Sequence, residues 1–255
     1  MKAKLFALSA LSAVALLGSA APSLADGAEA KKSNWSGSVS LTSDYRFRGI
    51  SQTDRNPAVQ GGIQYTGSQG IYVGAWASNV EFASDVSTEI DVYAGYTYAI
   101  DDKTAVSGQF IYYWYPNANN GEETNYWEVS AKLEHQLDMA GLYLEVAYAP
   151  AQASDAYSKS LSIKGGVEAG VVDSLPLFSD GLSVSANLGH QGFDDNTLVG
   201  LEDYMFYDIG ATATAGAFSL DVRYINTNLS EAECYGGLDW CEGGVVVTGA
   251  VSFGG

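Results

Sequence analysis

Residues 35–66 read WSGSVSLTSDYRFRGISQTDRNPAVQGGIQYT, and this stretch sets the pattern for the whole chain. In its first half one parity is apolar, at Val39, Leu41, Tyr45 and Phe47. The alternate positions are polar and include Asp44, Arg46 and Arg48. Because successive side chains of a strand point to opposite faces, residues 36–47 are predicted to form a strand with one apolar and one charged face.

The same alternation recurs in eleven further segments with no domain break between them. They lie near residues 57–66, 70–79, 88–100, 104–115, 125–135, 141–149, 159–171, 181–191, 203–213, 217–226 and 244–253. Each has about the 9–11 residues that a tilted membrane-spanning strand requires. No uninterrupted apolar run after residue 25 reaches the length of a spanning helix.

Charge is excluded from one face of these segments. Acidic and basic side chains such as Glu89, Lys132 and Arg223 all share the parity opposite to the apolar one. A basic residue on the lipid face of a barrel costs about 2–4 kcal/mol at the midplane, which would produce this sorting. A soluble β-sandwich also hides one apolar face, so the parity alone leaves that alternative open.

The breaks between segments alternate between long and short, which a sandwich has no reason to show. The long breaks are 48–56, 80–87, 116–124, 150–158, 192–202 and 227–243, whereas most of the others have three to five residues. Bacterial barrels have short periplasmic turns and longer outer loops. The sequence therefore predicts an all-β fold: one closed antiparallel transmembrane barrel of about twelve strands, with aromatic girdles that include Tyr45 and Phe47.

The first 25 residues have the features of a signal peptide. Lys2 and Lys4 precede an apolar run, and Ser23-Leu24-Ala25 is a small-x-small cleavage site; a retained N-terminal anchor is the alternative. We expect residues 26–34 to be a short periplasmic lead-in and residues 35–255 to form an outer-membrane barrel. Cleavage leaves ten basic and thirty acidic residues, a net charge of −20. That charge argues against nucleic acid as a partner.

A resemblance to a known family rests on two stretches. SDYRFRGISQTDRNPAVQGGIQY (residues 43–65) and GIYVGAWASNV (residues 70–80) resemble the start of the TorF-type porin family of Gram-negative outer membranes. The resemblance implies an outer-membrane barrel with a porin role and no established substrate. It also implies outer-membrane lipid and the barrel-assembly machinery as partners. One departure is that Phe253 is followed by two glycines, where such strands usually end on an aromatic residue.

The inward parity supplies the candidate pore lining. These residues are Asp44, Arg46, Arg48, Gln60, Gln64, Asp91, Glu128, Glu145, Asp208, Asp221 and Arg223. Acids outnumber bases, so an open lumen would favour cations among small hydrophilic solutes. Inward charges can also pair and close a barrel of intermediate width, which leaves a plugged structural or adhesive barrel with partner-binding outer loops as the alternative. The solute, the gating behaviour and the oligomeric state do not follow from these residues.

The first long break is the candidate constriction loop. It carries Arg48, Gln52, Asp54 and Arg55, and Gly49 allows a sharp bend. We expect the loop to fold inward and its arginines to pair with wall carboxylates such as Asp91 or Glu145. A mobile outer loop is the other interpretation.

The cysteines and histidines do not form a recognisable catalytic or metal-binding pattern. Cys234 and Cys241 lie in the last long break, and an oxidising envelope favours a disulfide between them. A metal site is disfavoured because no His accompanies Asp239 and Glu242 there. The two histidines, His135 and His190, lie near segment ends without a poised nucleophile. We therefore predict no enzyme activity and no cofactor.

Overall fold

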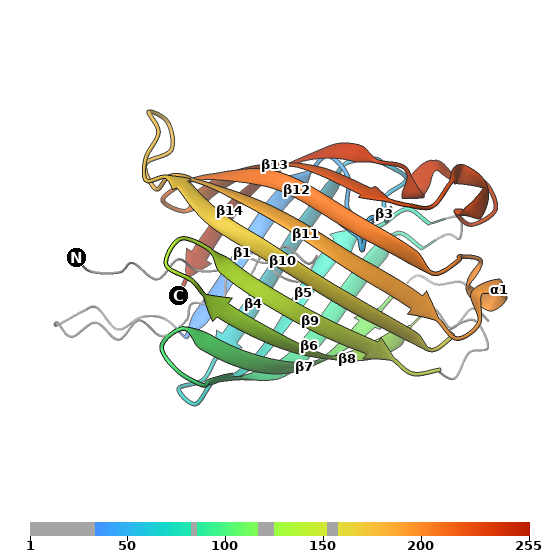
Figure 1. Ribbon diagram of the computed structural model, residues 1–255, viewed down its shortest axis with the longest axis horizontal. Coiled ribbons are helices and arrows are strands. Elements are labelled where there is room, and N and C mark those ends of the chain that lie inside the picture. The colour runs from blue at the N-terminus through green and yellow to red at the C-terminus, as the bar shows by residue number, and fades with distance from the viewer. Residues whose placement is uncertain (1–33, 83–85, 117–124, 152–157) are drawn as a thin grey trace.

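The computed structural model describes residues 34–82, 86–116, 125–151 and 158–255, which form a closed antiparallel barrel of twelve strands (Figure 1). β1 (Trp35–Thr42) closes the ring against β14 (Gly244–Gly254), with Ser36 opposite Gly254. The predicted all-β barrel of about twelve strands is thereby confirmed. The expected signal peptide, and all of the lead-in except residue 34, lie outside the described residues.

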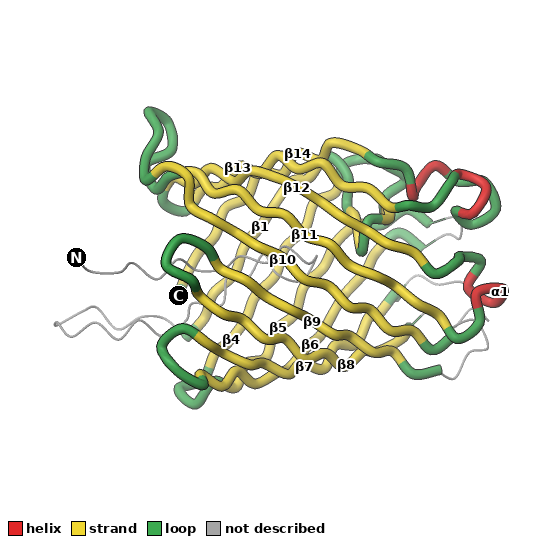
Figure 2. The backbone as a smooth tube through the Cα atoms, viewed as in Figure 1, coloured by secondary structure: helices red, strands yellow, loops and turns green. Residues whose placement is uncertain are grey.

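Ten more strands complete the wall, each paired with its neighbours in the chain (Figure 2). They are β4 (Ala58–Thr66), β5 (Ile71–Asn79), β6 (Thr88–Ala99), β7 (Thr104–Trp114), β8 (Tyr126–Gln136), β9 (Gly141–Ala149), β10 (Ser160–Val172), β11 (Leu182–Phe193), β12 (Tyr204–Ala215) and β13 (Phe218–Thr227). Eleven of the twelve predicted segments agree with these bounds to within two residues. Three single-turn helices lie in the loops: α1 (Asn196–Val199), η1 (Glu231–Glu233) and η2 (Asp239–Cys241).

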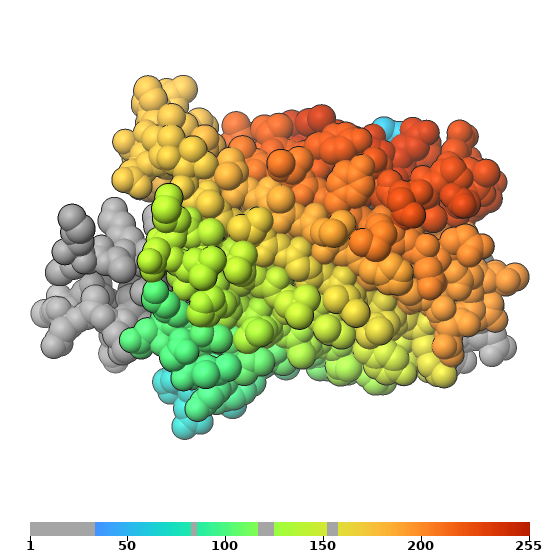
Figure 3. Space-filling view, viewed as in Figure 1, coloured from blue at the N-terminus to red at the C-terminus, as the bar shows by residue number. Residues whose placement is uncertain are grey.

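The two faces of the wall differ as the alternation predicts. On β1, Leu41 is 59 % exposed on the outside, whereas the next residue, Thr42, is 3 % exposed inside. Apolar side chains of the other strands, such as Leu144 and Ile209, are likewise exposed on the outer face. Figure 3 shows the part of this face toward the viewer as an unbroken layer of side chains. Among the described helices, none is long and apolar enough to cross a membrane.

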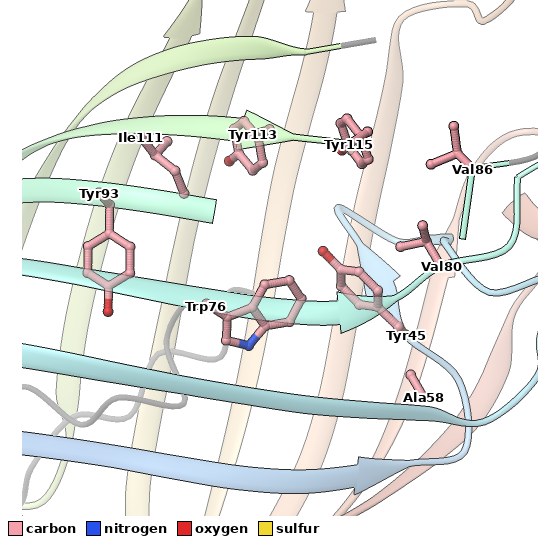
Figure 4. Close-up of a cluster of buried hydrophobic side chains, with 9 residues drawn as sticks. All are labelled: Tyr45, Ala58, Trp76, Val80, Val86, Tyr93, Ile111, Tyr113 and Tyr115. Carbon is pink, nitrogen blue, oxygen red and sulfur yellow. The ribbon is translucent and has the colours of Figure 1, made fainter. Parts of the chain in front are cut away.

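The first predicted segment was too long, and its last residues are not part of the wall. β1 ends at Thr42, and the chain then turns into the barrel, where β2 (Arg46–Phe47) and β3 (Ile50–Ser51) form a short hairpin. Tyr45 is buried beside Trp76 of β5, with ring centroids 5.3 Å apart (Figure 4). Phe47 packs edge-on against Tyr113 of β7. Placing Tyr45 and Phe47 in an outer girdle was therefore wrong.

Two apolar clusters fill the interior where the hairpin enters. One surrounds Tyr45 and Trp76 and includes Ile111 and Tyr115 of the β6–β7 side (Figure 4). The other gathers Ile50 of the hairpin with residues of β12 and of the loop between β13 and β14. β1 begins and β14 ends at the end of the barrel that carries the short turns (Figure 1). The hairpin and the last loop lie at the opposite end.

Candidate functional site in the barrel interior

A two-residue turn aims the β2–β3 hairpin across the lumen. Arg48 and Gly49 connect the two strands, and both have positive φ, 48° and 89°. Positive φ at both central residues is the signature of the type I′ turn, which matches the twist of an antiparallel hairpin. Arg48 holds this conformation without being glycine, which is uncommon and indicates that its side chain is held by other contacts.

Arg48 makes those contacts on the far wall. Its guanidinium forms two parallel bonds with Glu128 of β8, Nη2 to Oε2 at 2.8 Å and Nη1 to Oε1 at 3.0 Å. Nη1 also donates to Oε1 of Gln191 on β11 at 2.9 Å. β8 lies five places from β1 around the twelve-strand ring, so the hairpin reaches almost the opposite side. The wall carboxylate that Arg48 contacts is thus Glu128, and neither Asp91 nor Glu145, the two examples that the sequence suggests.

The electrostatics of this contact favour the charged pair. Burial by itself lowers the pKa of the Arg48 guanidinium, but the adjacent Glu128 carboxylate more than offsets burial and raises the pKa above its ordinary value. The Arg48 side chain is 13 % exposed and that of Glu128 is 4 % exposed. Bidentate Arg–carboxylate pairs are among the strong hydrogen bonds of proteins because both bonds are charge-assisted.

Asp44 fixes the base of the hairpin. Its carboxylate accepts a bond from the Arg46 Nε at 2.7 Å and another from the Ser51 hydroxyl at 2.7 Å. The Arg46 guanidinium continues to the backbone oxygens of Gly49, at 3.1 Å, and of Glu242, at 2.6 Å. Asp44, Arg46 and Arg48 therefore enter the interior from a loop and not from the first strand, because β1 has already ended.

The loop between β13 and β14 contacts the segment that follows the hairpin, at the end of the barrel opposite the short turns. The indole Nε1 of Trp240 donates to Asp54 at 2.6 Å, and Arg55 pairs with Asp239 and Glu242 at 3.1 and 3.3 Å. Cys234 and Cys241 are joined by a disulfide, with their Cα atoms 5.9 Å apart. The remaining candidate of the first loop is Gln52, whose side chain donates to the Ile50 carbonyl of the same loop at 3.1 Å.

Replacing both cysteines by serine should loosen this loop. By the chain-entropy relation for a loop of this length, the disulfide contributes about 2.5 kcal/mol. Chymotrypsin should then cut the loop near Tyr235 or Trp240 much faster than in the parent protein, with the barrel still folded on a gel of unboiled sample. Equal cutting rates would mean that the loop is held without the disulfide.

The other candidate lining residues lie on the wall as their parity predicts. Gln60 and Gln64 are buried on β4, and Glu145 is half-buried on β9. On the side of β12 and β13, Arg223 is paired with both Asp208 and Asp221 and also donates to Ser185 of β11 at 2.9 Å. On this side of the lumen one arginine is therefore shared between two aspartates.

A second group, which we call the acid–aromatic cluster, consists of Trp76, Glu89, Asp91, Tyr93 and Tyr113. All five side chains are buried. Trp76 lies opposite Asp91 on one neighbouring strand and Tyr113 lies opposite it on the other. Of these residues only Asp91 was among the sequence candidates. The inward parity of β6 contained the signal, since Glu89, Asp91 and Tyr93 follow one another at intervals of two.

The histidines lie away from both groups. His135 and His190 are exposed on the outer parity near strand ends. Thr104 Oγ1 lies 3.0 Å from the His135 Nδ1. Within the described parts of the chain, no three His, Cys, Asp or Glu side chains are grouped so that they could hold a metal ion.

Comparison with known proteins adds a family and a fold. Residues 27–250 match the model of a family described as "Bacterial protein of unknown function (Gcw_chp)". No curated protein matches the sequence.

Among solved structures, the NanC porin aligns with a TM-score of 0.58 at 10 % identity, over 84 % of this chain and 98 % of its own. The KdgM porin aligns with a TM-score of 0.55 at 10 % identity, over 86 % and 98 %. KdgM in complex with disordered oligogalacturonate gives a TM-score of 0.54 at 8 % identity, over 86 % and 97 %. At these identities the likeness concerns the fold.

Proposed function

The chain belongs to the Gcw_chp family of bacterial proteins, whose function is unknown, and for this member we propose an outer-membrane channel through which small hydrophilic solutes diffuse. Its partners in this role would be the outer-membrane lipid and the barrel-assembly machinery.

The sorting of charge between the two faces is the observation that carries the proposal. The outer face of the strands is apolar, with side chains such as Val59, Leu144 and Ile209 at least half exposed. Such an exposed apolar band would be a severe liability in water and is the normal outer surface of a barrel in lipid. The interior is polar and charged, as in water-filled barrels.

The interior charges favour cations. The described inward acids are Asp44, Glu89, Asp91, Glu128, Glu134, Glu145, Glu168, Asp208 and Asp221. The described inward bases are Arg46, Arg48, Lys132, Lys164 and Arg223. Nine acids against five bases give the lumen a negative field that attracts cations and repels anions. This balance argues against a polyanion such as oligogalacturonate as the solute of this chain.

The hairpin is the proposed constriction. It stands between the entrance and the wall of β8, and the Arg48–Glu128 pair anchors its tip there. A twelve-strand barrel is intermediate between barrels filled by side chains and those with wide channels, so one inserted hairpin sets its conductance.

Planar-bilayer recording tests the proposal. Folded protein, identified by its faster migration before boiling, should give stepwise currents in KCl. Under a KCl gradient the reversal potential should have the sign of cation permeation. Neutralising Glu145, a half-buried acid of the wall, should shift that potential toward zero. Folded protein without current steps would refute the channel, whereas anion preference would refute the charge argument.

One observation favours a second candidate, a structural or adhesive barrel with a plugged lumen. Ile50, Ser51 and Thr53 of the first loop are buried, so the hairpin is packed as well as inserted. Shortening the loop between β13 and β14 separates the candidates. A channel should change its current, whereas an adhesive barrel should lose surface binding and remain silent in the bilayer.

A further inference from the structure

We propose that the acid–aromatic cluster is a binding site for a protonated primary amine in the lumen, an inference that rests on the proposed channel and names the class of solute it selects. Two carboxylates alone would not carry this inference. Buried donor groups of other side chains in the same cluster also lack partners, and these give the independent reason to expect a ligand.

Strand register places Asp91 at the centre of the cluster. Glu89 and Tyr93 flank it on the same face of β6, and Trp76 and Tyr113 are directly opposite it on β5 and β7. Directly opposed residues of antiparallel strands have Cβ atoms about 4.5–5.5 Å apart, so the side chains of Trp76 and Tyr113 each lie next to that of Asp91. Gly74 of β5 is directly opposite Tyr93, and a Cβ at position 74 would collide with the Tyr93 ring.

No basic side chain among the described residues is paired with either acid of the cluster. Neither Glu89 nor Asp91 takes part in an ion pair within the described residues, whereas Arg48 and Arg223 are each matched with acids elsewhere. Asp91 is 0 % exposed, and both of its carboxylate oxygens and the Oε2 of Glu89 lack a hydrogen-bond partner. A buried carboxylate without a partner is costly, so a cationic ligand would be strongly favoured here.

An ammonium group matches this arrangement better than a metal ion does. A primary ammonium has three N–H donors, and the cluster offers three unpartnered carboxylate oxygens. Divalent cations such as Ca²⁺ take six to eight oxygen ligands, more than two carboxylates supply. Aromatic rings on both sides also favour an organic cation, since Trp and Tyr faces attract it.

The unpartnered donors indicate a second feature of the ligand. Trp76 Nε1 and the Tyr93 hydroxyl are buried without partners, and an indole N–H can only donate. A ligand that satisfies the whole cluster therefore carries a hydrogen-bond acceptor, such as a hydroxyl, close to its ammonium group.

Tyr45 covers the site. Its hydroxyl donates to Glu89 Oε1 at 3.4 Å. Its ring packs on Trp76, as Figure 4 shows. Tyr45 belongs to the first loop and not to the wall. Displacement of that loop would remove this cover without any change in the barrel strands.

Calorimetric titration of the folded full-length protein in detergent micelles tests the site. The probes are ethanolamine, methylammonium and tetramethylammonium chlorides, with CaCl₂ for comparison. We expect ethanolamine to bind most tightly, methylammonium less tightly, and tetramethylammonium, which has no N–H, weakest of the three. Asp91→Asn should weaken ethanolamine binding about tenfold or more, as expected for a lost charge-assisted bond in a buried site.

Two further variants keep the test sharp. Trp76→Phe retains an aromatic ring and should remove the advantage of ethanolamine over methylammonium. Glu134→Gln neutralises an inward acid that is already paired with Lys132 at 2.8 Å, and it should leave ethanolamine affinity unchanged. Tighter binding of tetramethylammonium or Ca²⁺, or no binding to folded protein, would overturn the site. Bilayer currents from the same samples separate this failure from failure of the channel itself.

Discussion

Arg48→Ala should open the lumen and destabilise the barrel at the same time. Removing the guanidinium leaves Glu128 as a buried charge without its partner, which typically costs about 3–5 kcal/mol. The hairpin tip also loses its anchor on β8 and β11. We expect a several-fold rise in single-channel conductance and a lower urea midpoint for unfolding from lipid vesicles.

Arg55→Ala is the matched control, because it removes an arginine of the same loop. The Arg55 side chain is 33 % exposed, and its partners Asp239 and Glu242 are about half exposed. Exposed ion pairs contribute about 0–1 kcal/mol, so stability and conductance should change little. If the two variants behave alike, the Arg48 contact is not what holds the hairpin across the lumen.

Leu144→Arg should weaken folding into lipid through a different mechanism. Leu144 lies in the middle of β9 and is half exposed on the outer face. Arginine at the bilayer midplane of a barrel costs about 2–4 kcal/mol. The measurement is the free energy of unfolding from lipid vesicles, in urea.

The control places the same residue on the other face. Ser130 of β8 is inward and half-buried, so Ser130→Arg adds the same charge to a polar interior that already has an acidic excess. It should cost clearly less than Leu144→Arg. The opposite order would mean that the apolar face does not lie against lipid.

Most strands of the wall could be predicted from the alternation of apolar and polar residues, because each face of a strand in a closed barrel has a single environment. Penalties for charge in lipid act on every second residue, and the sequence records them along the full length of each strand. The prediction fails where that constraint stops. Tyr45 and Phe47 continue the parity of Leu41, yet Tyr45 is buried and Phe47 half-buried inside the barrel, because the chain leaves the wall after Thr42.

The interior contacts could be predicted only in part, because they depend on closure of the ring. Inward parity correctly places Asp91, Glu145 and Asp221 on the inner wall. It does not show that Arg48 meets Glu128, a residue 80 positions away, since that contact needs both the hairpin turn and the register of the six wall strands from β1 to β8. The acid–aromatic cluster likewise depends on which residues of β5 and β7 oppose Asp91.

Site-directed spin labelling along β9 tests the central claim most directly. In a background with Cys234 and Cys241 replaced by serine, single cysteines at positions 142 to 146 are labelled in protein reconstituted into lipid vesicles. Collisions with oxygen, which concentrates in lipid, should be frequent at 142, 144 and 146 and rare at 143 and 145. Loss of this alternation, or its reversal, would contradict a barrel whose apolar face lies in the membrane and whose charges line the lumen.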